Sequence, residues 1–268
     1  MSQVADKIRD LRDNEGRAAL IGYLPVGYPS VEGSIEAARA LIEAGADILE
    51  LGVPYTDPVM DGETIQYAVQ EALEGGVRLR DVFTVIRAIS DLGAPVLVMT
   101  YFNPIFHYGL RRFAQELVEA GGAGLITPDL TPDAAQDWID VANEFDLDKV
   151  FLVAPSSTTE RLELTAAASR GFVYAASTMG VTGERATLGT RAEELVGRTR
   201  EAGAEIVCVG LGVSREEQAR DVGRYADGVI VGSAFVRPLS AEGPFDQRLA
   251  AMSDVARALA HGVRTARK

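Results

Sequence analysis

The chain has 268 residues, of which 47% are hydrophobic and 24% are charged, and its formal net charge is -13. This length suits one large α/β domain, because barrels of alternating strands and helices commonly reach about 250 residues as single domains. The negative charge disfavours non-specific nucleic-acid binding, so local backbone dipoles or one well-placed Arg would have to hold an anionic substrate.

The ends of the chain and its single cysteine narrow the class of protein further. Residues 1–14 are predicted to form a short amphipathic helix, without the apolar stretch of a signal peptide. No apolar run reaches membrane-spanning length, so we expect a cytoplasmic protein. Cys208 lies in an apolar run and is predicted to be a small buried hydrophobic residue, and one Cys excludes an internal disulfide framework or a zinc cluster.

Short apolar runs alternate with longer segments of helical periodicity along the whole chain. Eight runs are predicted to be strands: residues 18–23, 47–51, 96–99, 124–126, 150–153, 172–175, 206–209 and 228–231. Helices are predicted between them, among others at residues 35–44, 110–119, 134–144 and 192–201, with extra helical pieces at 79–92 and 244–263. Gly45, Gly121 and Gly203 are predicted to end helices in the left-handed conformation just before the next strand.

Eight strand–helix units without a break in composition indicate an α/β fold, a single (β/α)8 TIM barrel over residues 1–268 with extra N-terminal and loop helices. A doubly wound open sheet is the alternative. The strand count and the lack of an early glycine-rich dinucleotide turn argue against it.

The second predicted strand and the loop after it carry two carboxylates, Glu50 and Asp61. Burying an ionised carboxylate costs several kcal/mol unless the group is paired or protonated, so Glu50 within an apolar run predicts acid–base chemistry. The alternative is a structural ion pair between Glu50 and a neighbouring strand or helix.

Side chains at the carboxyl ends of barrel strands form the catalytic face, which places Glu50, Asp61, Tyr101 and Tyr174 there. The chain has only three Lys and two His residues, none of them well placed at a strand end: Lys7, Lys149, Lys268, His107 and His261. A Schiff-base mechanism needs a desolvated Lys beside the substrate. The predicted acid–base groups are therefore carboxylates and Tyr.

Glycine-rich connections follow the last three predicted strands, at residues 180–183, 210–214 and 231–234. Barrels often bind a phosphate at the loops after strands 7 and 8, where free helix-start amides face the anion. The alternative for each loop is an ordinary tight turn. Residues 176–189 form a long connection that is either a mobile lid over the substrate or a surface excursion.

These segments resemble the tryptophan synthase alpha chain family over nearly the whole chain. The resemblance rests on Leu49-Glu50-Leu51-Gly52-Val53-Pro54-Tyr55-Thr56-Asp57-Pro58 with Asp61-Gly62, on Gly180-Val181-Thr182-Gly183, and on Gly210-Leu211-Gly212-Val213 with Gly232-Ser233-Ala234. The first of these is highly specific, whereas the glycine loops alone would be weak.

The resemblance implies a lyase of tryptophan biosynthesis that has no cofactor of its own. It implies retro-aldol cleavage of indole-3-glycerol phosphate to indole and glyceraldehyde 3-phosphate. It also implies a partner, a tryptophan synthase beta chain that carries pyridoxal phosphate, in an alpha2beta2 heterotetramer in which indole passes through an internal tunnel. The loops after strands 2 and 6 would contact that partner, with Asp57 and Pro58 in the first of them.

The same resemblance assigns roles to individual residues. It implies Glu50 as the acid–base residue and Asp61 as the group that assists at the indole nitrogen. The residues implied for substrate binding are Tyr23, Met99, Tyr101, Ile126, Tyr174 and Thr182, and those implied for the phosphate are Gly183, Gly212, Gly232 and Ser233. This chain has Ser177-Thr178-Met179 where the family often carries an Arg, so closure contacts made by that Arg are not transferred.

Three other functions stay open at this point. Another phosphate-binding barrel enzyme, such as an indole-glycerol-phosphate synthase or a Schiff-base aldolase, would need a Lys at a strand end. An alpha-like subunit that only binds and activates a beta chain would not need both Glu50 and Asp61. A stand-alone indole-producing lyase would share the chemistry without the partner.

Overall fold

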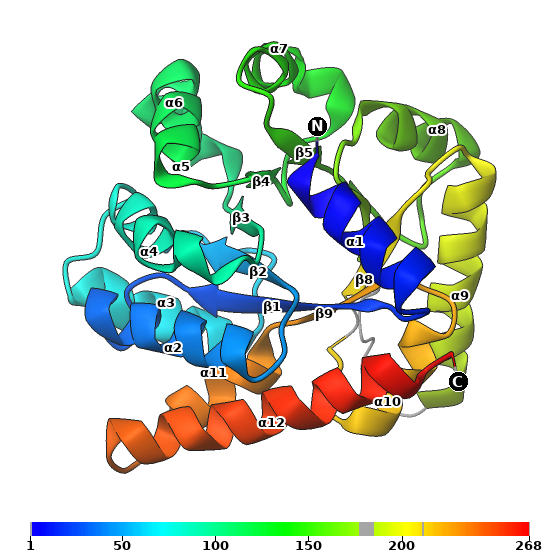
Figure 1. Ribbon diagram of the computed structural model, residues 1–268. Helices are drawn as coiled ribbons and strands as arrows, with labels where there is room; N and C mark the ends of the chain where they lie inside the picture. Colours follow the sequence, from blue (N-terminus) through cyan, green and yellow to red (C-terminus); the bar gives the residue numbers. More distant parts are fainter. Residues whose placement is uncertain (1, 177–184, 211, 268) are drawn as a thin grey trace.

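A barrel of parallel strands forms the centre of the molecule (Figure 1). The computed structural model describes residues 2–176, 185–210 and 212–267, and for residues 185–189 it describes the backbone only. The nine-stranded sheet has the order β5-β4-β3-β2-β1-β9-β8-β7-β6. Its strands are β1 (Ala19–Pro25), β2 (Ile48–Gly52), β3 (Val96–Met99), β4 (Gly124–Ile126), β5 (Asp148–Val150), β6 (Leu152–Val153), β7 (Val173–Ala176), β8 (Val207–Gly210) and β9 (Gly228–Val231).

The two edge strands of this sheet, β5 and β6, belong to one stretch of chain. Only Phe151 separates them, so the sheet closes on itself at this residue. The eight predicted strands and the TIM-barrel prediction are therefore confirmed, and the fifth predicted strand is split into two short pieces. The open doubly wound alternative is wrong, because β1 pairs with both β2 and β9 in a sheet whose two edges meet.

Helices surround the barrel. They are α1 (Gln3–Asn14), α2 (Val31–Glu43), α3 (Glu63–Glu74), α4 (Asp81–Ile89), α5 (Phe102–Tyr108), α6 (Leu110–Ala120), α7 (Gln136–Glu144), α8 (Thr159–Ala168), α9 (Arg185–Glu201), α10 (Glu216–Gly223), α11 (Ser233–Leu239) and α12 (Phe245–Thr265), with short 3-10 helices at Ser90–Leu92 and Pro132–Ala134. None of the helices in the described part of the chain is long and apolar enough to cross a membrane.

Glycines end several of these helices, as predicted. Gly45, Gly121 and Gly203 have φ angles of 113, 89 and 100, in the left-handed region that a side chain disfavours. Each lets the chain reverse directly into β2, β4 or β8, which keeps the connections short and the strands in register.

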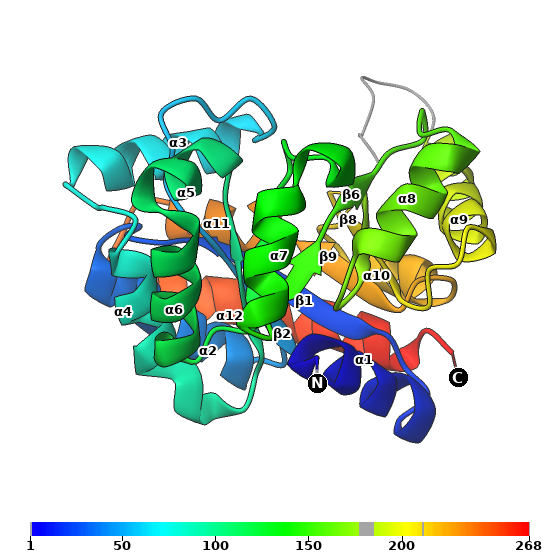
Figure 2. The same cartoon turned by 90° about the horizontal axis from the view of Figure 1, so that it is seen from above.

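Two layers of apolar side chains hold the fold together. One lies between the sheet and the outer helices, and the other fills the barrel interior. Strand residues alternate between them: Ile48 belongs to the interior layer, whereas Leu49 and Leu51 face the helices. Helix α1 completes the interior layer, with Ile8 and other apolar residues, and crosses one end of the barrel (Figure 1). Figure 2 shows α1 at one end and the segment between β2 and α3 at the other.

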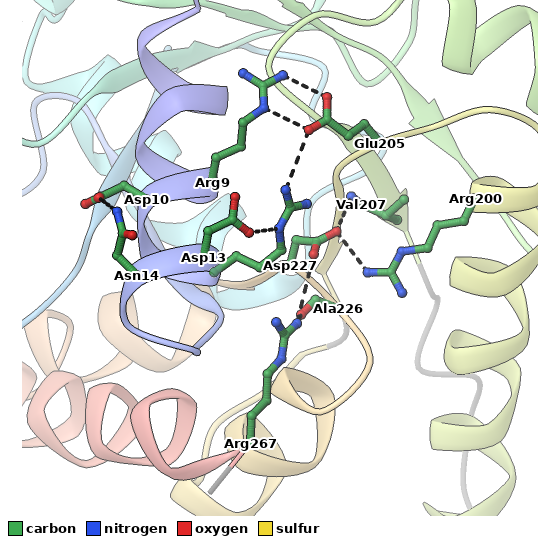
Figure 3. A network of polar contacts seen from close by, with 11 residues as sticks. Arg9, Asp10, Asp13, Asn14, Arg200, Glu205, Val207, Ala226, Asp227 and Arg267 are labelled. Carbon is green, nitrogen blue, oxygen red and sulfur yellow. Dashed lines mark hydrogen bonds and ion pairs between the residues drawn. The ribbon is translucent and has the colours of Figure 1, made fainter.

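Charged side chains at the α1 end are satisfied by one another (Figure 3). Buried Asp227 accepts hydrogen bonds from Arg200 Nη2 at 2.9 Å and from the backbone N–H of Val207 at 3.0 Å. Arg9 of α1 donates to both oxygens of Glu205, at 2.8 and 2.7 Å. Paired charges of this kind join α1 to the strand starts, so this end of the barrel serves stability rather than chemistry.

A buried ion pair at the same end gives a test of this role. Arg17 donates to both oxygens of Asp47 at 2.8 Å, and both side chains are buried. We expect Asp47→Ala to lower the free energy of unfolding by about 3 kcal/mol, because it leaves a guanidinium buried without its main partner. Urea unfolding measures this. The matched control is Arg111→Ala, which removes an exposed pair with Glu144 and should change stability far less. Equal losses in the two variants would contradict the assignment.

Candidate active site

Glu50 lies on β2 and faces the barrel interior. It pairs in register with Tyr23 of β1 and Leu97 of β3, and its side chain is fully buried. Neither carboxyl oxygen has a hydrogen-bond partner among the described residues, so the alternative of a structural ion pair has no support there. Burial raises the pKa of Glu50 to about 8. Glu50 is therefore a carboxylic acid at neutral pH, able to donate a proton.

Asp61 lies between β2 and α3, in a turn that hydrogen bonds hold in place. Its backbone N–H donates to Pro58 O at 3.1 Å, and its carbonyl accepts from Gln66 Nε2 at 2.7 Å. The neighbouring Met60 N–H donates to the phenol oxygen of Tyr101 at 2.8 Å. Partial burial raises the pKa of Asp61 to about 6, so Asp61 is ionised at neutral pH while Glu50 is not. The two carboxyl groups are thus set up for different roles.

Both carboxyl groups line one cavity of about 240 Å³ at the carboxyl ends of the strands. It brings together eight of the residues that the sequence predicted for the site: Tyr23, Glu50, Asp61, Met99, Tyr174, Gly212, Gly232 and Ser233. Five other residues line the cavity without a role assigned from the sequence, although Gly62 and Gly210 belong to the motifs named there: Met60, Gly62, Ile65, Gly210 and Ile230. Two kinds of position could have indicated them from the sequence. Gly210 and Ile230 lie on strands, and Met60 and Gly62 are the neighbours of Asp61.

Two predicted residues are placed differently, and two others lie outside the described residues. Tyr101 and Ile126 do not line the cavity, so their contact with substrate stays a prediction. Tyr101 instead holds the turn that carries Asp61, and Ile126 is packed inside the barrel. Thr182 and Gly183 lie outside the described residues, as do Ser177 to Met179.

Two inward-facing glycines make room for the tyrosines of the cavity. A Cβ atom built on Gly52 would lie 2.1 Å from the Tyr23 phenol oxygen, and one built on Gly210 would lie 2.4 Å from that of Tyr174. Each ring therefore crosses the end of the neighbouring strand, where only glycine fits. Burial holds the pKa of both phenols well above the usual range, so they stay protonated and can donate hydrogen bonds.

One rim of the cavity is built from residues that follow β8 and β9. Gly212 follows β8 with a φ of 65, Gly232 follows β9, and Ser233 is the first residue of α11. The first amides of a helix have no acceptor within the helix, and such amides bind anions. No Lys or Arg is among the described residues that line the cavity. An anion at this rim would therefore meet backbone dipoles rather than a basic side chain.

A larger cavity of about 370 Å³ lies at the α1 end, but its chemistry is less suited to catalysis. Its two arginines, Arg9 and Arg170, already pair with carboxylates. In the described part of the chain no cluster of His, Cys, Asp and Glu side chains could hold a metal ion. The chemistry therefore points to the smaller cavity with Glu50 and Asp61.

A closed (β/α)8 barrel with a protonated and an ionised carboxyl group in one cavity at its strand ends defines a barrel enzyme of the carboxylate acid–base class. Residues 10–264 match the family model described as tryptophan synthase alpha chain. The chain belongs to the tryptophan synthase alpha chain family.

Relatives cover almost the whole chain. The tryptophan synthase alpha chain of Leifsonia xyli is 55% identical over 263 residues, which are 98% of each protein. That of Mycobacterium marinum is 59% identical over 225 residues, 84% of each protein. A solved structure of tryptophan synthase from M. tuberculosis contains a chain that is 50% identical, with a TM-score of 0.89 over 98% of this chain and 99% of that one.

The alpha reaction of this family is the cleavage of indole-3-glycerol phosphate to indole and glyceraldehyde 3-phosphate, and it is the reaction of this chain. The chain is a carbon–carbon lyase of tryptophan biosynthesis, as the sequence predicted.

The buried Glu50 gives a prediction for stability. The unfolded chain loses the Glu50 proton near pH 4.5, whereas the folded chain keeps it until about pH 8. Folded-state stability therefore falls as pH rises through this window, at about 1.4 kcal/mol for each pH unit that separates the two pKa values. We expect the melting temperature of Glu50→Gln, relative to the native chain, to rise between pH 5 and pH 8 and to level off above. Any change in melting temperature that the amide causes equally at every pH does not affect this trend. A difference in melting temperature that stays constant from pH 5 to pH 8 would contradict the prediction.

Proposed function

We propose that Glu50 is the acid and base of the cleavage and that Asp61 stabilises the positive charge on the indole ring. One observation carries the proposal: a fully buried carboxylic acid without a partner among the described residues shares a cavity with a second, ionised carboxylate. The difference between their pKa values, about 8 and about 6, supports opposite protonation states at neutral pH.

The first step is protonation of the indole ring. Glu50 donates its proton to C3 of the indole, which turns the ring into an electrophilic indolenine whose positive charge is centred on nitrogen. The Asp61 carboxylate accepts a hydrogen bond from the ring N–H and stabilises that charge as it develops. The tyrosine rings that flank the cavity keep water away from Glu50, whereas Asp61 is only partly buried.

The second step breaks the bond between C3 and the glycerol carbon. The Glu50 carboxylate, now deprotonated, takes the proton from the hydroxyl group on that carbon. The carbon becomes the aldehyde of glyceraldehyde 3-phosphate, and the electron pair of the broken bond returns to the ring, which leaves as neutral indole. Glu50 ends the cycle protonated, so one residue serves as acid and then as base.

The other cavity residues bind the two ends of the substrate. We propose that Tyr23, Met99 and Tyr174 contact the indole ring. Tyr101 and Ile126, which do not line the cavity, keep their proposed contact with the indole. Backbone amides after β8 and β9 hold the phosphate, from Gly212, Gly232 and Ser233. Thr182 and Gly183, which lie outside the described residues, keep their proposed contacts with substrate and phosphate.

A Schiff-base mechanism lacks its nucleophile in the described part of the chain. Lys149 lies on β5, and its ammonium group donates to Asn143 Oδ1 at 2.7 Å rather than facing the cavity. Lys7 lies on α1, at the other end of the barrel. Both observations favour carboxylate chemistry over an aldolase of the Schiff-base type.

We propose a tryptophan synthase beta chain with pyridoxal phosphate as the partner, in an alpha2beta2 heterotetramer that passes indole from one site to the other. The family supports a beta-chain partner. This chain would bring no cofactor of its own, would form one barrel domain over residues 1–268, and would act in the cytoplasm. Exposed apolar side chains beside the cavity support a docking surface: Val59 is 80% exposed, Phe106 61% and Met60 55%. Asp57 and Pro58 directly precede Val59 and Met60 between β2 and α3, whereas Phe106 lies on α5.

The activity test combines pH dependence with one substitution. We expect kcat/KM for indole-3-glycerol phosphate to follow a bell-shaped pH profile. Its acid limb near pH 6 would report the ionisation of Asp61, and its alkaline limb near pH 8 the loss of the Glu50 proton. Glu50→Gln should lower kcat by about 10³-fold, because the amide can neither donate nor take up the proton. Steady-state kinetics with saturating beta chain measure both.

The control is Glu63→Gln at the start of α3, which removes a carboxylate outside the cavity and should leave the profile unchanged. Near-normal cleavage by Glu50→Gln would overturn the mechanism. Failure of the wild type to cleave the substrate with saturating beta chain would instead favour a subunit that only activates its partner.

The docking surface has a separate test. We expect Phe106→Asp to weaken the complex with the beta chain by about tenfold or more, because it places a charge in an apolar contact. The control is Val118→Asp, an exposed apolar residue that lies near α1 at the other end of the barrel. Light scattering or calorimetric titration with purified beta chain measures the affinity. Equal affinities for the two variants would place the partner on another surface.

A further inference from the structure

The side chain of Gln66 joins helix α3 to the turn that carries Asp61. Gln66 lies in the first turns of α3, and its Nε2 donates to the Asp61 carbonyl at 2.7 Å. The same nitrogen lies 3.5 Å from the carbonyl of Pro58, which accepts the Asp61 N–H at 3.1 Å. One amide group therefore contacts the carbonyl at each end of the turn from residue 58 to residue 61.

Side-chain packing does little to hold this turn. Val59 and Met60, its two central residues, are largely exposed. Polar contacts hold it instead, from Gln66 on one side and from the Tyr101 phenol oxygen, which accepts the Met60 N–H, on the other. A loop fixed by few contacts opens at low energetic cost, so each contact bears on where the Asp61 carboxyl group lies.

We propose that Gln66 is a positioning residue for the reaction, and that its side-chain amide fixes the Asp61 carboxyl group in the cavity. The inference rests on the proposed role of Asp61 and adds a residue that does not itself line the cavity. Charge stabilisation at the indole nitrogen depends on the distance and direction of the carboxylate. An amide that fixes the backbone of Asp61 therefore acts on the transition state through Asp61.

The inference predicts a change in the protonation of Asp61 as well as in rate. Loss of the Gln66 amide lets the turn open toward water, which lowers the pKa of Asp61 toward its ordinary value. A carboxylate at position 66 raises it, through repulsion between like charges. The other titratable groups that face Asp61 are unchanged in both variants: Tyr23 of β1, Glu50 of β2, Tyr174 of β7, and Tyr101, which lies between β3 and α5.

The experiment compares Gln66→Leu and Gln66→Glu with the same substitutions at Gln70. Gln70 lies one turn further along α3, is exposed, and donates to Glu74 rather than to the turn. Cleavage of indole-3-glycerol phosphate is measured with saturating beta chain. We expect both Gln66 variants to lower kcat by about tenfold, with KM changed less than about twofold. The acid limb of kcat/KM should move to lower pH in Gln66→Leu and to higher pH in Gln66→Glu.

Asp61→Asn separates this inference from the proposed function. In that background Gln66→Leu should change kcat by less than about twofold, because no carboxylate is left to position. If Asp61→Asn keeps normal kcat, the proposed role of Asp61 fails. If Asp61→Asn is impaired while Gln66→Leu and Gln66→Glu behave like their Gln70 counterparts, the role of Asp61 stands and the inference falls. Should Gln66→Leu not fold, the direction of the acid-limb shift in Gln66→Glu decides.

Discussion

The Glu50 carboxyl group lies inside a closed parallel sheet, and no described residue donates a hydrogen bond to it. Ionisation there is unfavourable, so the group holds its proton at neutral pH and is available as an acid. The barrel makes this possible because both neighbours of β2 are strands that keep water from the interior. Glu50 is thus a proton donor because its carboxyl group has no hydrogen-bond partner among the described residues. The tyrosines and glycines around it offer it none.

Buried carboxyl groups have Arg partners at one end of the barrel and none among the described residues at the other. At the α1 end the buried carboxylates of Asp47 and Asp227 have Arg partners and backbone donors, and they join the strand starts to the outer layer. At the other end Glu50 has no such partner, and Asp61 is placed by contacts to its backbone rather than to its carboxyl group. The paired charges at the α1 end therefore stabilise the fold, and the unpaired carboxyl groups at the other end are available for reaction.

Periodicity along the chain predicted the strands closely, because each contains a short apolar run between helical segments. The separation of β5 from β6 at Phe151 could not be predicted, since it depends on the pairing of neighbouring strands. Glu50 and Asp61 were predictable because a carboxylate in an apolar strand is costly. The crossing of Tyr23 over Gly52, and the use of Tyr101 as an anchor rather than a cavity wall, depend on side-chain directions across different strands. No local pattern encodes those directions.

Helix α1 has a further consequence for how the molecule forms. Its Ile8 and Leu11 belong to the interior layer together with residues late in the chain: Phe172 beside β7, Ile206 beside β8 and Ile230 of β9. During synthesis at about 5–20 residues per second, the first helix therefore waits roughly 10 s or longer for the strands that cover it. Until then only strands made earlier, among them β1 and β2 with Ala19, Ile21 and Ile48, can cover its apolar face, so closure of the barrel base is a late event in folding.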